Sequence, residues 1–166
     1  VLGSRGSVVP FFLDKAKENK LPITDEGMTR FNITLDQGVD MVLYGLEKQW
    51  GGEIYVPKIP SYKIMDVADA IAPQAVKPIV GIRPGEKLHE EMITETDSYN
   101  TVDCGKYYVI LPTIRNWDVD DFLGRFNAKF VEPGFKYNSG TNTEWESVPK
   151  LREMIKNHVD PTFEIH

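Results

Sequence analysis

The alternation of short apolar strands with amphipathic helices constrains the fold of this chain more than any other feature of its 166 residues. The most regular helix is predicted at 34–48, where Thr34 and Gln37 form a capping-box pattern and apolar residues recur at helical spacing. A pair of glycines ends this helix, and a short strand is predicted at 53–56. Because strands and helices alternate along the rest of the chain as well, the sequence predicts an α/β fold with mixed α+β character.

The remaining elements follow from the same two periodicities. Further helices are predicted at 7–19, 64–72, 86–93, 119–126 and 148–155, and further extended segments at 21–24, 29–33, 78–82 and 107–111. The 34–48 helix carries one apolar face, formed by Leu35, Val39, Val42, Leu43 and Leu46. Such a face is typical of a helix that packs against another part of a protein.

Composition excludes several classes of protein. Hydrophobic residues make up 41% and charged residues 27% of the chain, which is typical of a globular domain. The net charge of −6 argues against broad nucleic-acid binding, which requires a basic face. The single cysteine, Cys104, excludes an internal disulfide framework and argues against a cysteine-based zinc site. No apolar run approaches the roughly 20 residues that span a bilayer, so we expect a cytoplasmic protein without a membrane span.

The segment 81–90 is the first candidate for chemistry. Arg83 follows an apolar run, a Pro-Gly turn comes next, and the helix predicted at 86–93 begins directly after it. This order would place a cation and backbone N–H groups at a helix N-terminus, where phosphate is favoured. Glu86 lies one turn away, and its carboxylate could accept hydrogen bonds from ribose hydroxyls. The local alternative is a surface ion pair between Arg83 and Glu86, which would contribute little.

A second candidate is Arg30, which stands between positions that are predicted to be buried. A guanidinium there requires a partner, and the sequence leaves open whether that partner is a protein carboxylate or a bound anion. Residues 4–7 precede the first helix and could offer N–H groups to an anion, or form a flexible terminus. No metal site is expected, because His89 lacks a second histidine at ligand spacing.

Several segments taken together resemble one family, the bacterial inverting UDP-N-acetylglucosamine 4,6-dehydratases, which are extended short-chain dehydrogenases of polysaccharide biosynthesis. The matching segments are residues 3–12, 21–25, 28–31, 33–39, 51–61, 81–90 and 137–153. Their order and spacing are those of the family across nearly the whole chain. Asn32 and Glu146 depart from the pattern, since the family usually has an aromatic residue at the first position and often leucine at the second.

The resemblance implies that residues 1–166 form the C-terminal, substrate-binding portion of an extended Rossmann-type short-chain dehydrogenase. Residues 1–106 are then the better-matched core and residues 107–166 a C-terminal extension. The NAD(P)-binding half and the acid/base residues would lie upstream of Val1, so no catalytic residue is expected in this chain. The missing half is an expected partner, homo-oligomerisation is expected of the parent protein, and apolar helix surface is expected to be exposed.

The resemblance also implies a set of residues that bind UDP-sugar. Ser7, Val8 and Val9 would line the pocket at the start of the first helix. The backbone of Pro22, Ile23 and Thr24 would hold the uracil edge. Arg30 and Arg83 would grip the diphosphate, and Glu86 the ribose. Because a diphosphate is a dianion that planar guanidinium groups can hold bidentately, the physical reading agrees with the resemblance.

The resemblance therefore implies the UDP-sugar-binding half of an NAD(P)-dependent nucleotide-sugar 4,6-dehydratase, a lyase that inverts C5 and acts on UDP-N-acetylglucosamine. In the complete enzyme, C4 of the sugar is transiently oxidised, water is lost across C5–C6, and hydride returns to C6. One alternative is a non-catalytic interaction domain that reuses this half. Another is a related nucleotide-sugar epimerase.

Overall fold

The computed structural model describes all 166 residues and confirms the mixed α/β class. The chain forms two compact units, each assembled from separate segments. Unit 1 contains Val1–Leu35, Ile59–Glu90 and Ser139–His166, and unit 2 contains Asp36–Lys58 and Glu91–Asn138. The end of the chain thus returns to unit 1.

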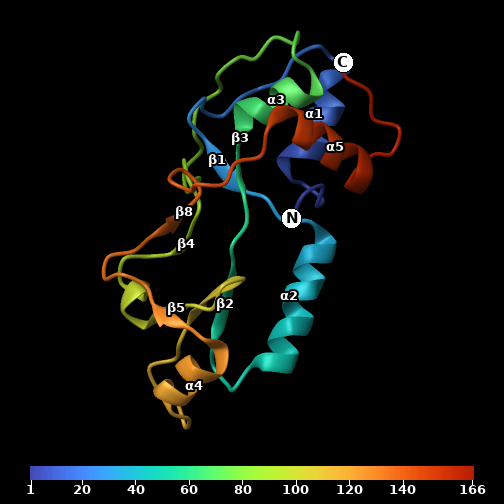
Figure 1. Cartoon of the computed structure of the whole chain (residues 1–166). Helices are drawn as coiled ribbons and strands as arrows, with labels where there is room; N and C mark the ends of the chain where they lie inside the picture. The colour runs from blue at the N-terminus through green and yellow to red at the C-terminus, as the bar shows by residue number, and fades with distance from the viewer. The chain divides into compact units, whose positions relative to one another are not determined.

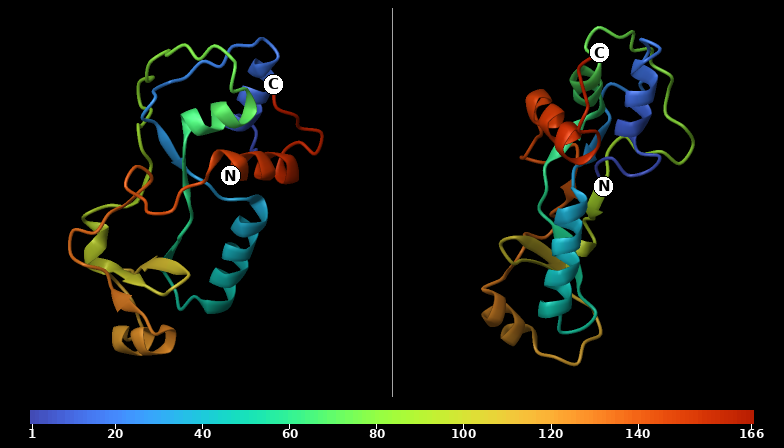
Figure 2. Two further views of the ribbon diagram at one scale, coloured as in Figure 1. Left: turned by 45° about the horizontal axis from the view of Figure 1, so that its top comes forward. Right: turned by 90° about the vertical axis from the view of Figure 1, so that its right-hand side faces the viewer.

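Unit 1 is a group of three helices beside a small sheet. The helices are α1 (Val8–Ala16), α3 (Ile64–Ile71) and α5 (Val148–His158), and α3 packs against both of the others. The sheet pairs β1 (Thr29–Phe31) antiparallel with β3 (Ser61–Lys63). The three helices lie side by side in Figure 1 and in both views of Figure 2.

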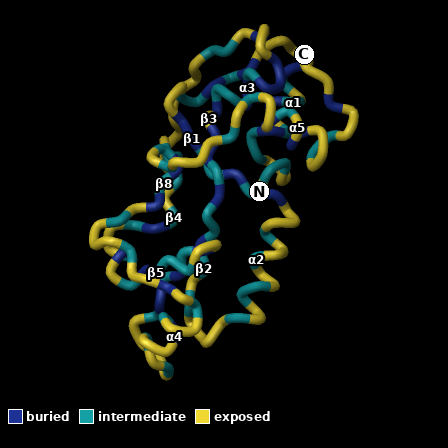
Figure 3. Tube along the Cα trace, in the orientation of Figure 1, coloured by how far each residue is buried: buried dark blue, intermediate teal, exposed yellow.

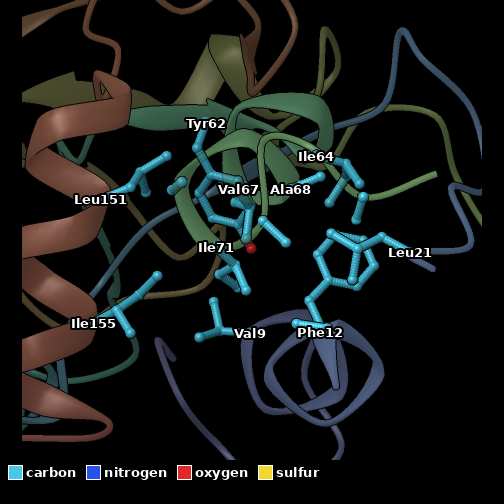
Figure 4. Close-up of a cluster of buried hydrophobic side chains, with 14 of the residues drawn as sticks. Val9, Phe12, Leu21, Tyr62, Ile64, Val67, Ala68, Ile71, Leu151 and Ile155 are labelled. Atoms are coloured by element: carbon cyan, nitrogen blue, oxygen red, sulfur yellow. The ribbon is translucent and has the colours of Figure 1, made fainter. Parts of the chain in front are cut away.

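The core of unit 1 forms around α3. Val67, Ala68 and Ile71 on this helix are completely buried. Figure 4 shows them between Leu151 and Ile155 of α5 on one side and residues of α1 on the other. Burial of each large aliphatic side chain contributes roughly 1.5–3 kcal/mol, so these contacts are the main force that holds the three helices together.

Unit 2 contains two antiparallel sheets. The larger has the order β2-β6-β5-β7 and the smaller pairs β4 with β8. The strands are β2 (Ile54–Pro57), β4 (Glu91–Ile93), β5 (Thr101–Asp103), β6 (Tyr107–Ile110), β7 (Lys129–Phe130) and β8 (Tyr137–Asn138). A 3-10 helix, η1 (Asp97–Asn100), precedes β5. The helix α4 (Val119–Phe126) has the predicted bounds and buries Phe122 against Val102 and Val109 of the sheet.

The helix predicted at 86–93 is wrong. Residues 86–90 form no regular element, and the last three residues of the range form β4. The backbone of this segment is engaged by distant partners, since the Thr29 N–H donates to the Leu88 carbonyl and the Ser139 N–H donates to the Glu90 carbonyl. Arg83 therefore does not precede a helix. The extended segments predicted at 21–24 and 78–82 form only isolated parallel bridges with each other and with neighbouring residues, not strands.

The helix predicted at 34–48 forms as α2 (Leu35–Lys48), directly after Thr34. The five side chains of its apolar face have exposed fractions between 49% and 68%, and no residue of α2 is buried. These side chains are Leu35, Val39, Val42, Leu43 and Leu46. Figure 3 shows only intermediate and exposed residues along it. Within unit 2, Tyr44 attaches the helix through ring contacts with Tyr55 and Tyr107. None of the helices is long and apolar enough to cross a lipid bilayer.

The two residues that depart from the family pattern contact each other. Asn32 is 2% exposed, and its Nδ2 donates to Glu146 Oε1 at 3.2 Å. The same amide nitrogen lies 3.3 Å from the Met154 sulfur, whereas Oδ1 of Asn32 has no partner. A buried amide requires a hydrogen-bond partner, so Glu146 compensates for a polar residue at position 32.

We expect Glu146→Leu to lower the free energy of unfolding by roughly 1–3 kcal/mol, because it leaves the Asn32 amide with only the weak sulfur acceptor. Urea unfolding followed by circular dichroism measures the change. Glu144→Leu, in the same segment but with an exposed side chain, is the matched control and should have little effect. Equal stabilities of the two variants would contradict the role given to Glu146.

Candidate functional site

Unit 1 contains a cavity of about 640 Å³ beside the start of α1. Most of the residues predicted to bind the ligand line it: Ser7, Val8, Pro22, Thr24, Arg30, Arg83 and Glu86. These residues come from three separate stretches of the chain, which the fold of unit 1 brings to one place. The volume lies in the range of sites for small molecules and cofactors.

Two predicted residues are not on the cavity wall. Val9 is 1% exposed and Ile23 is fully buried, and both belong to the core of unit 1. The backbone of Ile23 is also occupied, since its N–H donates to the Pro78 carbonyl and its carbonyl accepts from the Val80 N–H. Of this stretch, Pro22 and Thr24 remain beside the cavity, and proline has no N–H to donate.

The first turn of α1 presents uncapped polar groups to the cavity. Ser7 precedes the helix, but its side chain makes no capping hydrogen bond, and its Oγ is buried without any partner. In this first turn the N–H groups of Val8 and Val9 have no partner within the helix, and Pro10 has no N–H. Because the N-terminus of a helix also carries a partial positive charge, this end of α1 favours an anion.

Arg30 reaches the cavity from β1, where it lies opposite Tyr62 of β3. Its Nη1 donates to the carbonyls of Thr29 at 2.7 Å and Leu88 at 3.2 Å. Its Nε lies 3.5 Å from Oε1 of Glu90, whose side chain is 43% exposed. The sequence left open whether the partner of Arg30 is a protein carboxylate or a bound anion, and the structure leaves room for both. A carboxylate lies beside the guanidinium, but the pair is long and partly solvated, so Arg30 is not neutralised by a buried partner.

Arg83 and Glu86 lie on a turn at the cavity edge. The Glu86 N–H donates to the Arg83 carbonyl at 3.0 Å, and the Arg83 N–H donates to Glu86 Oε2 at 3.2 Å. Gly85 within the turn has φ +83°, a conformation that glycine adopts without strain. The side chains do not form the surface ion pair considered above, so the Arg83 guanidinium is available to a ligand.

Tyr62 is a lining residue that the sequence did not single out. It is 8% exposed, and burial raises the pKa of its phenol to about 12, although the positive charge of Arg30 opposes this shift. The phenol is therefore neutral at physiological pH and does not cancel the charge of Arg30. Its cross-strand position opposite Arg30 has no local sequence signal, because the register of β1 with β3 is a long-range property.

The cavity also has an apolar wall, formed by Phe11, Phe12, Met28 and Ile64. Phe12, Met28 and Ile64 are buried core residues, whereas Phe11 is 43% exposed. Two guanidinium groups, a helix N-terminus and one carboxylate on a partly apolar wall suit an anion that also carries hydroxyl groups and a flat or apolar moiety. No group of three or more His, Cys, Asp or Glu residues in the chain could hold a metal ion.

Known proteins that resemble the chain come from one family and from two kinds of enzyme. The sequence profile of a family described as polysaccharide biosynthesis protein matches residues 1–112. The chain is 50% identical to a UDP-N-acetylglucosamine 4,6-dehydratase (inverting) of Campylobacter jejuni over 96% of the chain and 49% of that protein. It is 38% identical to a UDP-glucose 4-epimerase of Rickettsia bellii over 95% of the chain and 47% of that protein. The chain thus spans about half the length of the curated relatives it matches.

A solved structure shares the fold. The X-ray structure of Pen from Bacillus thuringiensis matches with a TM-score of 0.78 and 29% sequence identity. The match covers 95% of this chain and 47% of that one. Both units of the chain therefore take part in the similarity.

The burial of Tyr62 predicts a pH-dependent loss of stability. Because its folded pKa is about 12 and its ordinary value is 10, the folded state favours the neutral phenol. This contribution is complete below pH 10 and is lost as the pH rises from 10 toward 12. Between pH 9 and pH 11 the wild type should lose about 1.4 kcal/mol more unfolding free energy than Tyr62→Phe, as measured by urea unfolding. Parallel losses in the two proteins would contradict the burial of this phenol.

Proposed function

The chain belongs to the polysaccharide biosynthesis protein family, and we propose that it is the UDP-sugar-binding half of an NAD(P)-dependent nucleotide-sugar 4,6-dehydratase. The proposed substrate is UDP-N-acetylglucosamine, with inversion at C5. The observation that carries the proposal is that Arg30 and Arg83, 53 positions apart in the sequence, line one cavity beside the uncapped start of α1.

The UDP moiety is the part of the substrate that the cavity supports best. The names of the dehydratase and epimerase relatives both contain a UDP-sugar, and the diphosphate is the strongest anion in such a molecule. Arg83 and the Nη2 group of Arg30 are the proposed diphosphate ligands, with the N–H groups of Val8 and Val9 as further donors. Glu86 is the proposed acceptor from the ribose, and Thr24 the proposed uracil contact. Two local cations make anion binding compatible with the net charge of −6.

The residues of this chain do not fit NAD(P). A dinucleotide site of the Rossmann type needs a glycine-rich turn between a parallel strand and a helix, whereas every pair of named strands here is antiparallel. The sequence also contains no G-x-G-x-x-G. We therefore assign this chain the task of binding and orienting the sugar nucleotide, and the proposal places the cofactor on the other half of the protein. Binding energy at the UDP end can lower the barrier at the distant sugar.

The exposed apolar face of α2 is the proposed contact with that other half. Five large apolar side chains on one helix face are exposed, and the chain accounts for 49% of its dehydratase relative. Hydrophobic faces of this kind mark surfaces that are covered in the assembled protein. Homo-oligomerisation of the complete protein remains a prediction of the resemblance, and its location in the cytoplasm remains a prediction from the lack of a long apolar run in the sequence.

We expect Arg83→Ala to weaken UDP binding by roughly 1.5–3 kcal/mol, because a charged hydrogen bond to the diphosphate is lost. Isothermal titration calorimetry of the 166-residue chain with UDP measures the change. Arg125→Ala, which removes an exposed guanidinium from unit 2, is the control and should leave the affinity unchanged. A wild-type chain without affinity for UDP would instead support the non-catalytic interaction domain.

UDP binding alone does not separate the dehydratase from the epimerase. The proposal predicts that the complete enzyme converts UDP-N-acetylglucosamine to a 4-keto-6-deoxy sugar nucleotide inverted at C5, which NMR can follow. Formation of a C4 epimer that retains its C6 hydroxyl would favour the epimerase.

The exposed face of α2 predicts concentration-dependent association of the isolated chain. The double variant Leu43→Lys/Leu46→Lys should be monomeric in sedimentation velocity at concentrations where the wild type associates. Asp40→Lys/Glu47→Lys adds the same number of lysines outside the apolar face and should still associate. A monomeric wild type, or equal association of both variants, would remove α2 from the proposed contact.

A further inference from the structure

A polar network, buried at Thr29 and Ser139 and half-buried at His89, lies in unit 1 outside the cavity lining. Oγ1 of Thr29 is 2.8 Å from Nδ1 of His89 and 2.7 Å from Oγ of Ser139. Thr29 is 4% exposed and Ser139 is fully buried. His89 does not line the cavity. The sequence offered His89 only as an incomplete metal ligand, and the proposed function gives it no task.

The network fastens residues 88–90 to β1. The Glu90 N–H donates to Ser139 Oγ at 2.9 Å, and the Ser139 N–H donates to the Glu90 carbonyl at 2.8 Å. The hydroxyl hydrogens can be placed so that each contact is a hydrogen bond. The Glu90 N–H then donates to Ser139 Oγ, the Ser139 hydroxyl donates to Thr29 Oγ1, and the Thr29 hydroxyl donates to His89 Nδ1. Because each hydroxyl then both accepts and donates, the bonds reinforce one another.

The fastened segment is also the one that holds Arg30. The Leu88 carbonyl accepts from Arg30 Nη1, and the Glu90 carboxylate lies beside Arg30 Nε. His89 stands between these two residues in the chain. The Thr29 carbonyl holds Nη1 from within β1, whereas the contacts of Leu88 and Glu90 with the guanidinium last only as long as residues 88–90 keep their place against β1.

The imidazole of His89 is confined on its other side by Gly140. A Cβ atom at position 140 would lie 2.6 Å from His89 Nδ1 and 2.7 Å from two ring carbons. Real Cβ atoms do not approach other atoms so closely, so any larger residue at position 140 would displace the ring. Glycine is required here for close approach of the backbone, although its φ is not positive.

We propose that His89 is a positioning residue for Arg30. Confined by Gly140 and bonded to Thr29, it holds Leu88 and Glu90 where they direct the Arg30 guanidinium into the cavity. Residues 139–140, which lie far along the chain from the cavity residues, are thereby part of the anion site. This inference rests on the proposed function for its ligand, but the positioning itself can be measured without one.

The first test needs no ligand. The order parameter of the Arg30 Nε–H bond, from ¹⁵N NMR relaxation of the 166-residue chain, should be well above that of exposed Arg125. His89→Ala should lower it clearly toward the value of Arg125, with only the bond to the Thr29 carbonyl left to restrain the guanidinium. His89→Asn, whose Oδ1 can accept from Thr29, should retain most of the wild-type value. His158→Ala, which removes an exposed histidine outside the network, is the matched control and should leave the order parameter of Arg30 unchanged. An unchanged order parameter in folded His89→Ala would overturn the inference.

Ser139→Ala is the second variant, since it removes one hydroxyl and keeps the backbone pairing. Should His89→Ala fail to fold by circular dichroism, Ser139→Ala decides in its place. It should lower the Arg30 order parameter while the melting temperature shows a folded protein. A folded Ser139→Ala with rigid Arg30 would likewise overturn the inference.

The second test uses UDP in a double-mutant cycle. His89→Ala should weaken UDP binding five- to tenfold with Arg30 present and less than twofold in the Arg30→Ala background. Equal losses in both backgrounds would show that His89 does not act through Arg30. If the wild type does not bind UDP, the proposed function fails, and the order parameter of Arg30 alone decides the positioning role.

Discussion

The direction of one guanidinium group is the constraint on which the site depends. Arg30 sits on a strand at the edge of the unit 1 core, where a cation is costly unless its N–H groups have partners. Backbone carbonyls of Thr29 and Leu88 satisfy one nitrogen, and Glu90 lies near another at 3.5 Å. The charge is thus held in place without being cancelled, which is the condition for an arginine that binds an anion.

The rest of unit 1 serves this placement. The helices α1, α3 and α5 form the apolar core, and the edge of that core becomes the wall of the cavity. The same packing brings the uncapped end of α1 and the turn of Arg83 to the same space. The hydrogen-bond network of Thr29, His89 and Ser139 fastens the segment that contacts Arg30. Stability and the proposed anion recognition therefore use the same contacts.

Local patterns predicted those parts of the structure whose causes are local. The helices α2, α4 and α5 appeared where apolar periodicity and capping residues placed them, with Ser147 accepting from the first turn of α5. The helix predicted at 86–93 failed because long-range hydrogen bonds to Thr29 and Ser139 outweighed local preference. Periodicity also could not predict that the apolar face of α2 is exposed. It shows that a helix has an apolar face, but not which part of the protein covers that face.

In the candidate site, too, the sequence predicted features with local causes and missed those that depend on long-range contacts. Arg30 and Arg83 were identified one by one from their surroundings, and the family resemblance joined them into one site. Their common cavity depends on long-range hydrogen bonds of residues 76–80 with 21–23 and of Leu88 with Thr29, which no short segment encodes. Tyr62 was missed because its place opposite Arg30 depends on the pairing of β1 with β3. Ile23 was expected at a ligand, but the core encloses it.

The most direct test of the central claim is a crystal structure of this chain with UDP. The account predicts that the diphosphate lies in the cavity, with oxygens about 2.7–3.2 Å from nitrogens of both Arg30 and Arg83. UDP bound at another surface, or in the cavity with its diphosphate turned away from both guanidinium groups, would contradict the account.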